Sequence, residues 1–131
     1  MIKAFEIAAS GLSAERLRMD IISSNIANSN TVKTEDGGPY RKRSVVFEAV
    51  PFKNYLSKVK VADVIRDDNP PKLKYEPNNP LADKNGYVKY PDINPIIEMT
   101  DLIEAMRAYQ ANSSVIDAAK SIVKDTLSVL G

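Results

Sequence analysis

Side chains suited to proton transfer, nucleophilic attack or metal binding are scarce in this chain. Its 131 residues include no cysteine and no histidine, which excludes thiol nucleophiles, disulfides, zinc fingers and the commonest general base near neutral pH. The sequence also lacks Gly-x-Ser-x-Gly, a P-loop and a dinucleotide-binding glycine pattern. We therefore expect no enzyme activity, no cofactor, no bound metal and no small-molecule substrate.

The polar groups that remain have simpler interpretations. Asp67-Asp68 has no further ligands at EF-hand spacing, which favours a solvated turn. Arg41-Lys42-Arg43 is a short basic cluster in a chain of net charge +1, so we expect neither nucleic acid nor anionic lipid as a partner. Asn112-Ser113-Ser114 matches a glycosylation sequon but falls inside a predicted helix.

Membrane insertion and a secretory signal are not expected either. Charged residues interrupt the first thirty positions, so no apolar signal segment forms there. No stretch approaches the roughly 18 apolar residues of a membrane span. Export from the cytoplasm would therefore need a route without a cleaved signal.

Apolar residues recur at intervals of seven near both ends of the chain, which indicates long amphipathic helices with one seam each. We predict helices over residues 2 to about 29 and 96 to 130. The nine seam residues are the candidate assembly interface: Phe5, Leu12, Met19, Ile26, Leu102, Tyr109, Ile116, Val123 and Leu130.

Small and polar residues accompany these seams. Gly11 interrupts the first helix, either as a tolerated surface glycine or where a neighbouring backbone comes close. Ala105, Asn112, Ser113 and Ala119 lie beside the second seam, where small side chains allow close helix approach and a polar one can specify register.

Seven of the eight prolines fall between residues 39 and 91, and this middle region has strand-like patterns. We predict strands at 43–50, 58–65, 72–75 and 87–90, with a tight turn over Asp83–Gly86 because Asn-Gly accepts positive φ. The predicted fold is α+β: two long terminal helices packed as an antiparallel coiled coil around a small β-rich middle. The predicted parts are residues 1–36, 37–95 and 96–131.

The second helix would be roughly 50 Å long, more than a globule of this size needs. It must therefore cover another long helix or lie along other subunits. The seams alone leave open whether they pack within one chain or between chains.

Five segments carry a recognisable pattern, and together they extend over most of the chain. They are residues 9–12, 25–31, 38–42, 75–94 and 99–112. The first two resemble the N-terminal signature of bacterial flagellar rod and hook proteins. Gly-Tyr-Val-x-Tyr-Pro at 86–91, Leu-Ile-Glu-Ala-x-Arg-Ala-Tyr at 102–109 and the short length narrow the resemblance to the flagellar basal-body rod protein family, and to the proximal rod within it.

The resemblance implies a structural subunit that transmits torque from the motor to the distal rod and hook. It implies export without a cleaved signal through the flagellar type III apparatus, and polymerisation with copies of itself and other rod subunits. The expected location is the basal body, in the rod that crosses the periplasm, with the terminal helices as an inner coiled-coil layer. A soluble helical adaptor or export chaperone of the flagellar system is the alternative.

Overall fold

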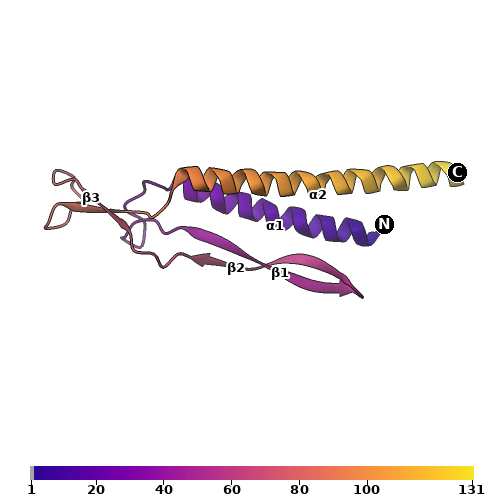
Figure 1. Cartoon of the computed structure of the whole chain (residues 1–131), viewed down its shortest axis with the longest axis horizontal. Helices are drawn as coiled ribbons and strands as arrows, with labels where there is room; N and C mark the ends of the chain where they lie inside the picture. The colour runs from indigo at the N-terminus through magenta and orange to yellow at the C-terminus, as the bar shows by residue number, and fades with distance from the viewer. Residues whose placement is uncertain (1) are drawn as a thin grey trace.

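Two long helices from the ends of the chain run side by side in the computed structural model, which describes residues 2–131 (Figure 1). The elements are α1 (Ile2–Ala27), β1 (Arg43–Lys53), β2 (Leu56–Arg66), β3 (Lys72–Tyr75), β4 (Tyr87–Tyr90) and α2 (Pro95–Leu130). This order confirms the predicted α+β fold with a β-rich middle between terminal helices.

The start of α2 is specified by its first residues. The side chain of Asn94 accepts a hydrogen bond from the backbone N–H of Ile96, and Pro95 occupies the first helical position, where its missing N–H costs nothing. The helix then continues for 36 residues, roughly 54 Å. Within residues 2–131, neither helix combines the length and the apolarity needed to cross a bilayer.

A polar tract at residues 23–31 ends α1 slightly earlier than the predicted residue 29. The last helical residue is Ala27, and the amide of Ser29 bonds to the carbonyl of Ile26 in a tighter turn. The side chain of Asn28 also bonds back to the carbonyl of Ser24. Asparagine and serine side chains compete with helical hydrogen bonds in this way.

The β1–β2 hairpin is longer than the sequence indicated. Its antiparallel register pairs Arg43 with Arg66 at the open end and Lys53 with Leu56 at the turn, where Asn54 has φ of 50°. The register shifts twice, after Val46 and after Pro51. A proline donates no ladder hydrogen bond, so its place at an irregularity lets the strand continue past it.

Strands β3 and β4 have the predicted bounds and form a second antiparallel pair, from Lys72↔Tyr90 to Tyr75↔Tyr87. These strands and the loop that joins them are called the β3–β4 arm (residues 72–90), which projects away from the helices (Figure 1). At its turn Gly86 has φ of 86°. Hydrogen bonds from Asn79 and Tyr90 lower the pKa of Glu76 and tie the loop to β4.

The other elements form three layers: α2, then α1, then the β1–β2 hairpin (Figure 1). Among the described elements, α2 packs against α1 alone, whereas α1 packs against α2, β1 and β2. The buried apolar side chains along the helices are mostly alanines. The helix axes can therefore approach closely, but the core is narrow and contains few large side chains.

Candidate assembly interface

The nine predicted seam residues lie beside the line of closest helix contact. All four on α1 are half-buried, as are Leu102, Tyr109 and Ile116 on α2. The last two are exposed: Val123 retains 40% and Leu130 80% of its accessible surface. The seam therefore divides into a part covered within the chain and a part that is open.

The contact line itself consists of smaller residues. On α1 it includes Ala8 and Gly11, and on α2 it includes Ala105 and Ala119, all of which are buried. A Cβ atom on Gly11 would lie 2.7 Å from Nδ2 of Asn112. Gly11 is thus a point of close approach and not a surface glycine, although its neighbour is a side chain and not the backbone that was considered.

The two helices are antiparallel, as the contacts along their length show. Gly11 faces Asn112, Arg18 forms an ion pair with Glu104 at 3.8 Å, and Asn25 bonds to Glu98. Continuing this pairing places Ile2 opposite residue 121. The end of α2 from residue 122 therefore extends past α1, as Figure 1 shows at the yellow end of the chain.

The extension of α2 carries large apolar side chains with little cover. Leu127 is 63% and Val129 86% exposed. Where the extension begins, a shallow apolar hollow is lined by Phe5 of α1 and by Lys120, Val123, Lys124 and Leu127 of α2. An apolar helix face without a partner is typical of a protein–protein contact surface.

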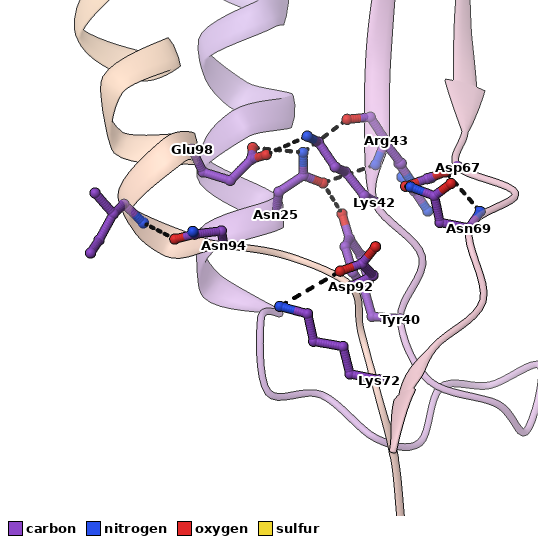
Figure 2. A network of polar contacts seen from close by, with 11 residues as sticks. Asn25, Tyr40, Lys42, Arg43, Asp67, Asn69, Lys72, Asp92, Asn94 and Glu98 are labelled. Carbon is purple, nitrogen blue, oxygen red and sulfur yellow. Dashed lines mark hydrogen bonds and ion pairs between the residues drawn. The ribbon is translucent and has the colours of Figure 1, made fainter. Parts of the chain in front are cut away.

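A buried polar network closes the opposite end of the helix pair (Figure 2). Asn25 of α1 is 1% exposed. Its Oδ1 accepts hydrogen bonds from the Arg43 amide at 3.0 Å and from the Tyr40 hydroxyl at 2.9 Å. Its Nδ2 donates to the Arg43 carbonyl at 2.8 Å and to Glu98 Oε2 at 3.1 Å. The side-chain amide therefore uses its full hydrogen-bonding capacity.

Glu98 is the charged member of this network and is also only 1% exposed. Its Oε1 accepts a hydrogen bond from Lys42 Nζ at 2.8 Å. This hydrogen bond is the main reason why the pKa of Lys42 is raised, and burial of the ammonium group partly opposes it. A buried carboxylate needs such partners, because an uncompensated buried charge is costly. Asn25, Lys42 and Glu98 are called the helix-base lock below.

Sequence reasoning missed Asn25 and Glu98 as buried residues. A signal was present on α2, because Glu98 lies seven residues before Ala105, which lies seven before Asn112, and Ala119 follows at the same interval. That second line of sevens is the contact line. It was hard to recognise because its members are alanines or polar residues and none is a large apolar residue.

The β1–β2 hairpin is attached to α1 at two further points. The Val59 amide donates to Ser10 Oγ at 3.1 Å, and Lys58 Nζ lies 3.1 Å from Glu6 Oε2. Together with the Asn25–Arg43 pairing, these contacts hold the hairpin along the length of α1. Both additional contacts are partly solvent-exposed.

The basic cluster and the acidic pair singled out in the sequence stabilise loops. The basic cluster and Asp67 line a hollow of about 400 Å³ beside the arm. There Arg41 bonds to the Asp67 carbonyl and pairs with Asp68, and Arg66 pairs with Asp36. Asp67 also accepts from the amide and side chain of Asn69. Among residues 2–131, no group of three or more acidic side chains could hold a metal ion.

Comparison with known proteins identifies the class to which this elongated helix–hairpin fold belongs. A family described as Flagella basal body rod protein matches residues 5–32, which lie mainly on α1. A second, described as Flagellar basal body rod FlgEFG protein C-terminal, matches residues 84–129, from the arm through α2. The chain belongs to the flagellar basal-body rod proteins.

Full-length relatives narrow this assignment. The chain is 42% identical to the flagellar basal-body rod protein FlgC of Borreliella burgdorferi, with 99% of this chain and 97% of that protein covered. It is 44% identical to FlgC of Salmonella typhimurium and 43% identical to FlgC of Escherichia coli O6:H1, in each case over 98% of this chain and 97% of the relative. The chain is a member of the FlgC family.

Family membership confirms the structural, non-enzymatic function expected from the sequence. The chain is a structural subunit of the flagellar proximal rod and assembles with other rod subunits in the basal body. The resemblance is therefore confirmed over the alternative of an adaptor or export chaperone. The residues through which the subunits contact one another are the subject of the proposal that follows.

Proposed function

We propose that this rod subunit polymerises through the open parts of its two helices, and that the nine seam residues contribute to the assembly interface, Val123 and Leu130 with exposed side chains and the other seven with the surface that remains uncovered within the chain. The extension of α2 past α1 carries the proposal, because its apolar side chains keep between 40% and 86% of their accessible surface within the described chain. Copies of the same chain and other rod subunits are the partners. Both helices would then form an inner layer of packed helices.

The amount of uncovered apolar surface is sufficient for association. Eleven large apolar side chains of α2 are exposed: Ile96, Ile97, Met99, Ile103, Met106, Val115, Ile122, Val123, Leu127, Val129 and Leu130. Burying one such side chain contributes about 1.5–3 kcal/mol, whereas association costs about 4–15 kcal/mol. Because these side chains are already partly covered, neighbours must bury most of the eleven to offset that cost.

Torque transmission requires that a subunit resist deformation at its joints. The close helix contact at Gly11 and Asn112 and the fully bonded Asn25 side chain provide such resistance. Closely packed side chains resist sliding past each other. In this function the protein acts through packing, and no reaction is involved.

Delivery of the chain is part of the same proposal. We infer export by the flagellar type III apparatus without a cleaved signal, followed by assembly into the rod across the periplasm. The narrow core supports this, because its buried apolar residues are mainly alanines and it has no disulfide to reduce. An elongated fold with so few large core side chains costs little to unfold before transit.

The three predicted parts fit this proposal. Residues 1–36 and 96–131 supply the two helices, and residues 37–95 supply both hairpin elements. The middle part consists of two elements that lie apart. The β1–β2 hairpin lies against α1, while the β3–β4 arm projects beyond the helices (Figure 1). We propose that the arm faces neighbouring subunits outside the helical layer.

Substitution at the open seam tests the interface. Val123→Asp places a charge on the extension of α2, and Ser121→Asp introduces the same charge two residues earlier on the same exposed helix segment. Each is expressed in cells that lack the native gene, and hook–basal bodies are purified. We expect Val123→Asp to abolish swimming and recovery of the rod, while Ser121→Asp retains both. Normal rods with Val123→Asp would contradict the proposed interface.

A further inference from the structure

We propose that the helix-base lock couples two docking events within the subunit. The β1–β2 hairpin is held more firmly against α1 when α2 is paired with α1, and α2 is held more firmly when the hairpin is docked. The lock joins the three segments through Asn25 of α1, Lys42 before β1 and Glu98 of α2 (Figure 2).

The first step of the argument concerns what α2 supplies. Glu98 provides one carboxylate oxygen to Asn25 and the other to Lys42. Among residues 2–131, the Lys42–Glu98 ion pair is the only polar contact between α2 and the segment that leads into β1. The strands themselves do not pack against α2. Any influence of α2 on the hairpin must therefore pass through this cluster or through α1.

The second step concerns what happens when Glu98 is absent. Asn25 would retain its two bonds to Arg43 but would lose the acceptor for its second N–H. Within residues 2–131, Lys42 would lose the one carboxylate with which it forms an ion pair. Hydrogen bonds to charged groups are stronger than those between neutral ones. The base of the hairpin is thus held by more favourable contacts when α2 is in place.

The third step compares this attachment with the others. The Ser10–Val59 hydrogen bond and the Lys58–Glu6 ion pair fix the hairpin farther along α1, where water has access. Exposed ion pairs contribute little to stability. Because coupling between two binding events is reciprocal, the hairpin must favour α2 docking by the same factor by which α2 favours hairpin docking.

Hydrogen exchange of the purified full-length chain, followed by mass spectrometry, tests the proposal. Asn25→Asp places a carboxylate directly against that of Glu98, and Glu98→Gln restores a complementary pair in the double variant by exchanging amide and carboxylate. Glu104→Gln is the control, because it removes the same charge from α2 in the exposed pair with Arg18.

We expect Asn25→Asp to speed amide exchange of β1 and β2 at least about tenfold, as the loss of a charge-assisted bond predicts. Glu98→Gln alone should also speed exchange in the hairpin, and adding it to Asn25→Asp should recover only the part of the loss that comes from the two facing carboxylates, because the Arg43 carbonyl lacks its donor in both variants that carry Asn25→Asp. The Glu104→Gln variant should match the native chain within about twofold.

Three results would overturn the coupling. One is hairpin exchange that stays at the native rate in Glu98→Gln. The second is a double variant that exchanges as fast as Asn25→Asp alone, which would mean that Asn25 holds the hairpin only through its bonds with Arg43 and that Glu98 has no part in it. The third is a native hairpin that exchanges at the rate of an unstructured peptide, because no lock would then hold it.

Discussion

Asn112 of α2 lies directly against Gly11 of α1, with its Nδ2 atom 2.7 Å from the place where a Cβ atom would stand. Alanine at this position would gain about 1 kcal/mol in helix propensity, but its methyl group would displace the Asn112 side chain. We therefore expect Gly11→Ala to be close to neutral in the native chain. In an Asn112→Ala background the same change should raise the free energy of unfolding by about 1 kcal/mol.

Urea denaturation of the four combinations measures this dependence, with Ser13→Ala as a control on the exposed face of α1. The effect of Ser13→Ala should be the same in both backgrounds. An equal effect of Gly11→Ala in the two backgrounds would mean that the two residues do not interact.

Removal of the Lys42 charge tests the ion pair in the helix-base lock. Lys42→Met leaves the buried Glu98 carboxylate with only Asn25 as a partner, so the free energy of unfolding should fall by about 3 kcal/mol. Lys42→Met with Glu98→Gln should recover at least half of this loss, because the uncompensated charge is gone.

The matched control for this substitution is Lys72→Met, which breaks the exposed Lys72–Asp92 pair at 3.6 Å. Its cost in urea denaturation should stay below about 1 kcal/mol. Equal losses for Lys42→Met and Lys72→Met would show that burial of Glu98 adds nothing to the importance of its partner.

Because the pKa of Lys42 is raised in the folded chain, the free energy of unfolding should depend on pH in the alkaline range. A group whose pKa is higher in the folded state stabilises that state fully below its unfolded-state value, here 10.5. This stabilisation is lost as the pH rises through the folded-state value. The difference in unfolding free energy between the native chain and Lys42→Met should therefore be constant up to about pH 9.5 and shrink above about pH 10.5. If the difference already declines between pH 7 and pH 9, its pH dependence comes from a group other than Lys42.

Gly86 combines a positive φ of 86° with close neighbours, since a Cβ atom would lie 2.9 Å from the Tyr75 ring and 3.2 Å from Pro77. Gly86→Ala should lower the free energy of local opening of the arm by about 1–3 kcal/mol, measured as faster amide exchange in β4. Gly37 has φ of 90° but open space around it, and Gly38 has neither constraint. The expected order of cost is Gly86, then Gly37, then Gly38, and a large effect at Gly38 would contradict it.

Local signals in the sequence were sufficient for most of the fold. The cap by Asn94 and the proline after it place the start of α2, and the Asn-Gly pair places the turn at Gly86. Both rest on short-range backbone chemistry. The end of β1 was wrong by three residues because Pro51 normally ends a strand, and only the partner strand shows that it lies at an irregularity.

The contacts between the helices were harder to predict than the helices themselves. Apolar residues spaced seven apart indicated which side of each helix is buried. Which seven-residue line makes the closest contact depends on the residues of the partner helix. Here the line that contains Ala105 and Asn112 is closest, and the larger Tyr109 and Ile116 lie beside it. Glu98 shares the seven-residue spacing of that line, but its partners Asn25 and Lys42 lie far away in the sequence, so the spacing alone did not show that a charged residue would be buried there.

The position of α1 between α2 and the β1–β2 hairpin has a mechanical consequence. Apart from the Lys42–Glu98 ion pair, load applied to the hairpin reaches α2 through two joints in series, and the compliances of joints in series add. The joint between the helices is a close contact lined by buried alanine and glycine, with Asn112 against Gly11, whereas the joint to the hairpin includes polar bonds at Asn25 and Ser10. Most of the elastic twist within a subunit should therefore accumulate on the hairpin side of α1.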